Sequence, residues 1–292
     1  MSLKSVLESR QFAVTAEIGP AKGTDITEIV EVAELLHGRI TAANATDQQS
    51  SQMRMGSMAT CHILADHGIE PIMQMTCRDR NRIALQSDLL SAWALGIKNV
   101  LALTGDLPAL GDHPQATPVF DLDSVQLLSV IGRLNEGFDM AGTALKGKPD
   151  FFVGAAVNPG SNTEASQDMQ LFKMEKKIKA GAKFFQTQAV YEPAKFAAFM
   201  KKAGSFGVPV LAGLIPLKSA GMARFLNKSI AGVFVPEEMI QKMSTAKDKT
   251  QTSLEITVGL IKELKDMCQG VHIMAMGWEK KIPQMLDAAG LK

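Results

Sequence analysis

Short apolar runs alternate with longer amphipathic segments along almost the whole chain. Several of these runs, such as NVLALTG at 99–105 and VPVLAGLIP at 208–216, are apolar throughout instead of alternating with polar positions. Continuous apolar runs are typical of strands covered on both faces, as in parallel sheets. The pattern predicts eight strands, at residues 12–18, 39–44, 70–76, 98–104, 151–157, 183–189, 208–215 and 271–276.

Between the strands, apolar positions recur with the spacing of a helix. Eight strand–helix alternations without a break in composition predict one α/β domain over residues 1–292, a single (β/α)8 TIM barrel. A doubly wound open sheet is the alternative, but its first turn would be expected to read GxGxxG, and this chain has GPAKG at 19–23. Helices are expected at residues 26–37, 52–67, 80–95, 122–136, 164–180, 193–203, 235–244, 250–267 and 279–289.

The composition excludes several classes of protein. Of the 292 residues, 46% are hydrophobic, and 31 basic against 30 acidic side chains leave a formal net charge of +1. No lysine- or arginine-rich stripe is present, so we expect no nucleic-acid partner. Because there is no signal peptide, no apolar run long enough for a membrane span and only three scattered cysteines, we expect a cytoplasmic protein without disulfides or membrane contact.

Polar side chains gather where the predicted strands end. In a TIM barrel the carboxyl ends of the strands form one mouth, and the loops that follow them carry the active site. Each residue has an ordinary explanation: Glu17 could pair with Lys22 at the rim, and Asp106 could be a turn residue. Their convergence on one mouth, beside the irregular loop 106–121, favours a functional site. The polar ends are Glu17, Asn44, Thr76, Asp106, Val157 with Asn158, Gln188, and Met276 with its neighbours.

Three other patterns carry weaker chemistry. GTALKGK at 142–148 has the spacing of a phosphate loop, but a proline follows where Ser or Thr is required, so we interpret it as a surface turn. Cys61, His62 and His67 lack the spacing of a zinc site, and we expect no metal. Lys218 could form a Schiff base as in barrel aldolases, although a lysine in such a loop is more often a surface residue.

Four segments together resemble methylenetetrahydrofolate reductases in their order and spacing. They are FAVTAEIGPAKG at 12–23, QMTCRDRNR at 74–82, NVLALTGDLP at 99–108 and KKIKAGAKFFQTQAVYE at 176–192. The resemblance covers essentially the full chain and corresponds to the compact bacterial type. It implies a barrel with a flavin at its carboxyl face. Hydride would pass from the flavin to 5,10-methylenetetrahydrofolate and give 5-methyltetrahydrofolate.

The resemblance assigns roles to four residues at the mouth. Glu17 would be the general acid that protonates N10 and opens the folate ring, and its apolar pocket is expected to raise its pKa. Asp106 would lie between flavin and pterin, where its charge favours the cationic iminium. Gln188 would read the pterin ring with its amide. Met276 is expected to line the substrate site.

The flavin contacts carry over less completely. Many relatives have histidine at the position of Gln74, arginine at Thr104 and an aromatic residue at Val157, so FMN and FAD both remain open. Lys177 and Lys173 would reach the ribityl–phosphate portion, with a solvated lysine-rich helix face as the alternative. The expected cofactor contacts are Asn44, Gln74, Thr76, Thr104, Gly105, Asp106, Val157, Lys173 and Lys177.

The resemblance leaves the electron donor open between NADH, NADPH and a partner protein. Some compact bacterial relatives work beside a zinc- and iron–sulfur-containing subunit, and the three scattered cysteines here cannot hold such a cluster themselves. A homo-oligomer is compatible with the sequence, and no regulatory C-terminal domain is expected. Two rival functions remain: a flavin-free barrel methyltransferase that acts on methyltetrahydrofolate, and a non-enzymatic scaffold subunit.

Overall fold

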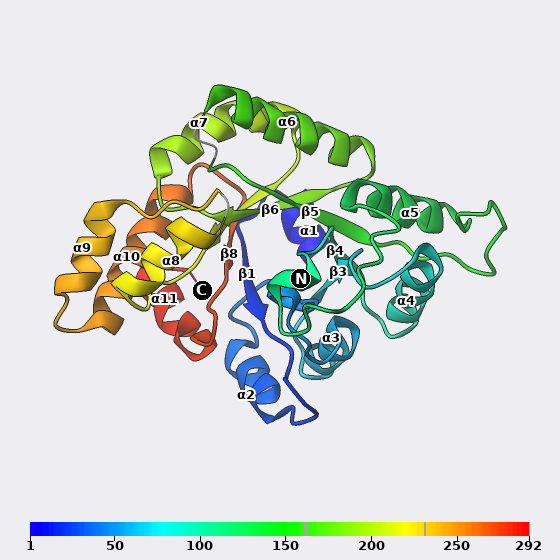
Figure 1. Cartoon of the computed structure of the whole chain (residues 1–292), viewed down its shortest axis with the longest axis horizontal. Helices are drawn as coiled ribbons and strands as arrows, with labels where there is room; N and C mark the ends of the chain where they lie inside the picture. Colours follow the sequence, from blue (N-terminus) through cyan, green and yellow to red (C-terminus); the bar gives the residue numbers. More distant parts are fainter. Residues whose placement is uncertain (161–162, 231, 292) are drawn as a thin grey trace.

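The computed structural model describes residues 1–160, 163–230 and 232–291. Within these residues, eight parallel strands close into a barrel in chain order, and helices surround it (Figure 1). The predicted TIM barrel is therefore confirmed, and the open sheet is excluded. The strands are β1 (Ala13–Ile18), β2 (Ala42–Ala45), β3 (Pro71–Thr76), β4 (Asn99–Leu103), β5 (Phe152–Val157), β6 (Phe184–Ala189), β7 (Val210–Leu214) and β8 (Gly270–Ile273).

The helices follow the predicted pattern with three differences. The predicted helix 52–67 begins only at Ser57, because residues 49–56 are tied into the loops above the barrel. Helices α1 and α8 were not predicted; α1 has only six residues, and each of the two carries three buried side chains. The α-helices are α1 (Leu3–Glu8), α2 (Thr27–Leu36), α3 (Ser57–Asp66), α4 (Arg82–Ala94), α5 (Ser124–Glu136), α6 (Glu164–Lys179), α7 (Pro193–Ala203), α8 (Ala220–Ser229), α9 (Glu237–Thr245), α10 (Lys249–Leu264) and α11 (Ile282–Ala289).

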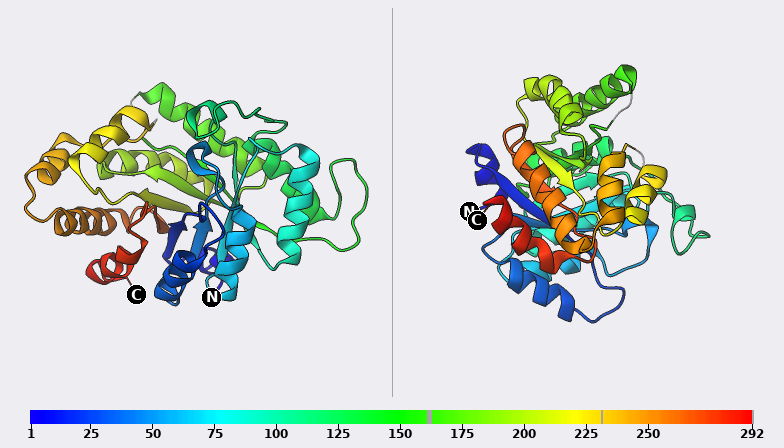
Figure 2. Two further views of the ribbon diagram at one scale, coloured as in Figure 1. Left: turned by 60° about the horizontal axis from the view of Figure 1, so that its bottom comes forward. Right: turned by 90° about the vertical axis from the view of Figure 1, so that its left-hand side faces the viewer.

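The segment 142–148, which has the spacing of a phosphate loop, lies in the connection between α5 and β5. This connection projects away from the barrel in the left view of Figure 2. A bridge joins Phe138 to Ala144, and strand β5 follows instead of a helix. The segment is therefore a surface turn, as predicted.

The helix α1 closes the amino-terminal end of the barrel. Its apolar side chains Leu3, Val6 and Leu7 are buried against the first inward-facing residues of the strands, among them Phe152 and Phe184. The rings of these two phenylalanines stack at 5.3 Å. The lower barrel interior is therefore an apolar plug.

The next inward-facing layer is polar. Because strand side chains alternate between faces, the residues two positions beyond the apolar plug also point into the barrel. On β5 this position is Gly154, where an added Cβ would lie 2.3 Å from the Phe184 ring. The other members are Thr15, Asn44, Gln74, Leu103, Gln186, Gly213 and His272, and all but Leu103 and the two glycines are buried polar residues.

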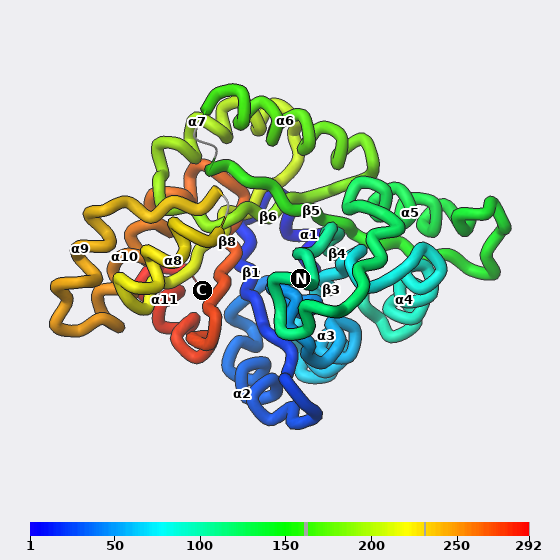
Figure 3. Tube along the Cα trace, viewed as in Figure 1, coloured from blue at the N-terminus to red at the C-terminus, as the bar shows by residue number. Residues whose placement is uncertain are grey.

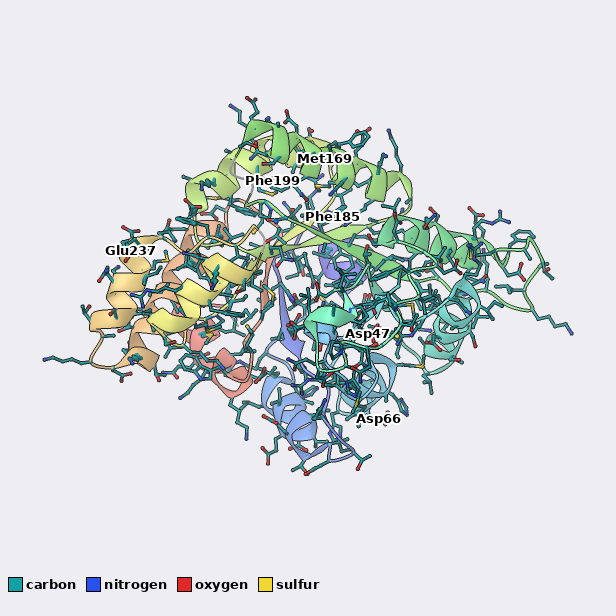
Figure 4. The ribbon with its side chains drawn as sticks, viewed as in Figure 1. Asp47, Asp66, Met169, Phe185, Phe199 and Glu237 are labelled. Carbon is teal, nitrogen blue, oxygen red and sulfur yellow. The ribbon has the colours of Figure 1, made fainter. Side chains whose placement is uncertain are left out.

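The main apolar core lies between the outer face of the sheet and the helices. Phe185 on β6 and Phe199 on α7 are both fully buried there and point into the same layer (Figure 4). This core fixes the strand ends from outside, so the polar interior does not have to stabilise the barrel alone.

Replacement of Leu7 by alanine tests the role of α1 as a floor. Leu7 is 2% exposed, so its loss should lower the free energy of unfolding by about 2–5 kcal/mol in a urea titration. The exposed neighbour Glu8→Ala is the matched control and should change it by less than about 0.5 kcal/mol. Equal effects of the two substitutions would show that α1 is not packed against the barrel.

Candidate active site

Glu17 lies at the carboxyl end of β1 inside the barrel mouth and is only 8% exposed. Gln49 Nε2 donates to its Oε1 at 2.9 Å, and Gln74 Nε2 donates to its Oε2 at 3.2 Å. His272 Nε2 lies 3.7 Å from the same Oε2, which is ion-pair distance but longer than a hydrogen bond. The carboxyl group is therefore surrounded by donors.

This environment corrects the expected charge state of Glu17. Burial raises the pKa of the Glu17 carboxyl, as expected for a desolvated acid. His272 at ion-pair distance, together with the amides of Gln49 and Gln74, acts in the opposite direction and prevails. The pKa is therefore lowered, and Glu17 is a carboxylate near neutral pH in the free protein.

The rim pair of Glu17 and Lys22, which was the alternative explanation of Glu17, does not form. Lys22 Nζ instead contacts Asp112 at 2.5 Å and the carbonyl of Met53 at 2.7 Å. Asp112 also accepts from the Met53 backbone N–H at 3.0 Å. Lys22 thus joins the loops after β1, β2 and β4, and Glu17 takes its partners from inside the barrel.

The loop after β2 is held in an unusual conformation. Gln48, Ser50 and Ser51 all have φ between +51° and +55°, the left-handed region that non-glycine residues rarely adopt. The short 3-10 helix in this loop, Gln49–Ser51, contacts a second one after β4, Pro108–Leu110. In Figure 3 the segment after β4 folds back across the strands beside this loop. The contacts between these two short helices compensate the backbone strain. They hold the loop so that the Gln49 side chain points toward Glu17.

Buried amides and a hydroxyl extend the site below Glu17. Asn44 Nδ2 donates to Gln186 Oε1 at 2.7 Å, and Gln186 Nε2 donates back to Asn44 Oδ1 at 3.0 Å. His272 Nδ1 lies 3.0 Å from Thr15 Oγ1 and 3.4 Å from Gln186 Nε2. Asn44, predicted as a cofactor contact, is fully buried with both amide atoms engaged, so it supports this network below the rim.

Gln49, Gln186 and His272 were not predicted as site residues. Two of them could have been found from strand periodicity, because Gln186 precedes Gln188 by two positions and His272 pairs with Thr15 across the sheet. Gln49 lies in an irregular loop that carries no periodicity. No sequence pattern indicates where its amide points.

The rim above β4 holds Asp106 in an exposed position. Its carboxylate forms no hydrogen bond or ion pair to another described residue, while its backbone carbonyl accepts from Ser51 Oγ at 3.0 Å. Gly105 has φ +94°, and an added Cβ would lie 3.0 Å from Arg78 and 3.1 Å from Thr76. Only glycine fits this close turn, which fixes the backbone that presents Asp106. Thr104 Oγ1 accepts from the first backbone N–H of α5 at 3.2 Å.

Thr76 is bound by a buried carboxylate. Asp47, whose side chain is 0% exposed, accepts from the Thr76 N–H at 2.8 Å and from its hydroxyl at 3.0 Å. Arg80 donates to both oxygens of Asp47, at 2.8 and 3.2 Å, and to Asp88 at 2.9 Å. Figure 4 shows Asp47 near the ends of the central strands. This cluster anchors the end of β3, where Gln74 and Thr76 lie.

The two lysines of α6 occupy different environments. Lys177 Nζ donates to the carbonyl of Ala156 on β5 at 2.7 Å, whereas Lys173 is exposed. Burial, and then the charge of Lys173, lower the pKa of Lys177, against the attraction of Asp123. The Val157 side chain is buried in the core between sheet and helices, so it does not face the mouth.

Gln188 and Met276 lie on the same rim. Gln188 is half-buried at the end of β6, beside a register shift in the pairing with β7, and its amide is unbonded to other described residues. Met276 is 47% exposed with φ +53°. Its carbonyl accepts from Lys218 Nζ, so Lys218 holds the loop after β8.

A cavity of about 590 Å³ lies at the opposite, amino-terminal end of the barrel. Its lining includes Arg10, Phe152, Lys183 and Lys265, and none of the predicted site residues. We place the candidate site at the carboxyl mouth because Glu17, Gln74 and His272 from three different strands meet there, below the free side chains of Asp106 and Gln188. In the same parts, no group of three His, Cys, Asp or Glu side chains is arranged to hold a metal, and no helix is long and apolar enough to cross a membrane.

Comparison with known proteins decides the family. The sequence model of methylenetetrahydrofolate reductase matches residues 2–290. The chain belongs to this family. The resemblance seen in the four sequence segments is thereby confirmed over nearly the whole chain.

Methylenetetrahydrofolate reductase 2 of Schizosaccharomyces pombe is 27% identical over 239 residues, which cover 77% of this chain and 36% of that protein. The 5,10-methylenetetrahydrofolate reductase of Escherichia coli K12 is 25% identical over 188 residues, covering 63% of this chain and 56% of that protein. The chain thus spans about a third to a half of the length of these relatives.

A solved structure shares the fold. It is an uncharacterised Clostridium thermocellum protein that binds two copies of 5-methyl-5,6,7,8-tetrahydrofolic acid, with a TM-score of 0.68 and 16% identity. The match covers 98% of this chain and 97% of that one. A 2,3-dimethylmalate lyase aligns less closely, with a TM-score of 0.54 and 11% identity over 98% of this chain and 84% of that one.

Replacement of Asp47 by asparagine tests the anchor below Thr76. The change leaves Arg80 without its buried partner, so the free energy of unfolding should fall by about 3–5 kcal/mol in a urea titration. Asp88→Asn is the matched control, since Asp88 binds the same arginine with a side chain that is 36% exposed, and it should cost under about 1 kcal/mol. Similar losses in both variants would contradict the anchoring role of Asp47.

Proposed function

We propose that this protein reduces 5,10-methylenetetrahydrofolate to 5-methyltetrahydrofolate with a flavin bound at the carboxyl mouth of the barrel. The observation that carries the proposal is the buried Glu17, held by two amides and facing His272, below a rim where Asp106 and Gln188 keep free polar groups. Membership of the reductase family supports it. In this proposal, residues 1–292 act as one flavin-binding catalytic domain.

The rim fits a flavin in its donors and charges. Lys173 and the two remaining N–H groups of Lys177 offer cations for a phosphate on one side of the mouth. Gln74 and Thr104 offer polar atoms and the close turn at Gly105 offers accessible backbone on the neighbouring strands, while Asp47 engages the N–H and the hydroxyl of Thr76. A flavin held there would supply the hydride for the reduction. The proposal includes either FMN or FAD.

Glu17 would open the folate ring. The carboxyl O–H bond breaks, an N–H bond forms at N10, and the electron pair of the carbon–N10 bond stays on N10. The methylene carbon is left as an N5 iminium cation, which can accept hydride. Gln49 and Gln74 would hold the carboxyl group in place for this transfer.

Asp106 and Gln188 would bind the two ends of the reacting pterin. The free carboxylate of Asp106 favours the cationic iminium by its charge. The free amide of Gln188 provides one donor and one acceptor face for the pterin ring. Met276, exposed at the end of β8, would cover the apolar edge of the substrate.

The electron donor would be NADH, NADPH or a partner protein with a zinc or iron–sulfur centre. Anaerobic mixing of the purified protein with each donor in turn distinguishes them by the rate at which the flavin absorbance bleaches.

The visible spectrum of the purified protein tests the proposal. Flavin bands that bleach on addition of 5-methyltetrahydrofolate are expected, because the reaction is reversible in principle. A colourless protein that binds methyltetrahydrofolate after incubation with FMN and FAD would support the flavin-free methyltransferase and contradict the proposal. Absence of both flavin and folate binding would leave a scaffold.

Replacement of Glu17 by glutamine isolates the acid. The variant keeps an amide of nearly the same shape but has no proton to give N10, so folate reduction should fall by at least about 100-fold. Reduction of the flavin by its donor should change less than about threefold, which serves as the internal control. Folate turnover within about threefold of the unmodified protein would show that Glu17 is not the acid.

A further inference from the structure

His272 is a buried histidine whose ionisable neighbour is the proposed acid. It is 3% exposed, and Glu17 at 3.7 Å is the charged group within ion-pair distance of it in the described part of the chain. The other groups that face it are neutral: Thr15 from β1, Gln186 from β6 and Gly213 from β7. A change in the charge of either residue therefore acts electrostatically mainly on the other.

The network around His272 can satisfy either protonation state. Thr15 Oγ1 lies 3.0 Å from His272 Nδ1 and 3.4 Å from the carbonyl of Val271. When Nδ1 carries a proton, Nδ1 donates to Thr15, and the Thr15 hydroxyl donates to Val271. When Nδ1 is bare, the hydroxyl turns and donates to it. Nδ1 therefore has a hydrogen-bond partner in the imidazolium and in either neutral tautomer, so the imidazole can gain or lose a proton without leaving Nδ1 unpaired.

We propose that Glu17 and His272 hold one proton between them, and that His272 is the positioning residue that keeps this proton available for folate ring opening. The inference rests on the proposed function for the use of the proton, but not for its sharing. It resolves the conflict between a carboxylate that is ionised in the free protein and a reaction that needs an acid.

The transfer is balanced within the pair. In the resting state of this proposal the shared proton lies on the imidazole, and Glu17, whose pKa is lowered, is the carboxylate. Closing the 3.7 Å separation to a hydrogen bond allows Nε2–H to pass its proton to Oε2, which leaves a neutral imidazole and a carboxylic acid. Glu17 then gives the proton to N10, and the pair regains a proton from solvent after product leaves.

The carboxyl 13C signal of Glu17 tests the sharing directly. The signal, assigned by its loss in Glu17→Gln, should move in two steps with pH in the unmodified protein, because a coupled pair titrates twice. In His272→Asn it should move in one step that lies between the other two. If the Glu17 signal moves in a single step at the same pH in the unmodified protein and in His272→Asn, the proposal is overturned. This measurement does not require turnover. A protein without reductase activity would contradict the proposed function, but its 13C titration would still show whether Glu17 and His272 share a proton.

The pH profile of folate reduction tests the use of the proton. Loss of His272 should move the alkaline limb of the profile to lower pH by roughly one to three units, since Glu17 alone releases its proton earlier. A merely structural role would lower the rate at all pH values without moving the limb, and that result would overturn the proposal.

Two further variants control this experiment. His62→Asn breaks a pair with the same 3.7 Å separation, but His62 and Asp66 are 48% and 64% exposed, so the limb should stay in place. Thr15→Val removes the hydroxyl that accepts from Nδ1 and should move the limb in the same direction as His272→Asn by a smaller amount. The Thr15→Val variant replaces His272→Asn as the test if His272→Asn does not fold. If folded Thr15→Val leaves the alkaline limb of the pH profile unmoved, the proposal is contradicted.

Discussion

A carboxylate inside a closed barrel has to be satisfied by groups that the barrel itself supplies. An unpaired buried charge costs several kcal/mol, and Glu17 is only 8% exposed. The layer of amides, hydroxyl and imidazole beneath the mouth meets this requirement with donors from β3, β8 and the loop after β2. The apolar plug and α1 lie below that layer. The barrel interior is therefore apolar at its amino-terminal end and polar toward its carboxyl mouth.

The loops above the mouth also help to satisfy the buried Glu17 carboxylate. Gln49 reaches Glu17 only because its loop is kept in a strained conformation by contacts with the segment after β4. That segment presents Asp106, whose backbone is fixed by the close turn at Gly105. The position of the acid and that of the free rim carboxylate are thus coupled through one set of loop contacts.

The sequence was sufficient for the barrel because eight apolar runs alternate with helical spacing. It was insufficient for α1, whose three apolar positions are too few to show periodicity, and for the start of α3, which long-range loop contacts delay to Ser57. Glu17, Thr76 and Gln188 could be placed at the mouth from strand ends alone. The sign of the pKa shift at Glu17 could not, since it depends on His272, which lies 255 positions later in the chain. Val157 illustrates a further limit, because a strand end fixes the height of a side chain but a register shift of one position decides its face.

A crystal structure of the protein with 5-methyltetrahydrofolate tests the central claim most directly. The account predicts the pterin at the carboxyl mouth, with N10 within hydrogen-bond distance of Glu17 and the ring against Gln188. Folate bound instead in the 590 Å³ cavity at the amino-terminal end, with Glu17 unengaged, would contradict it.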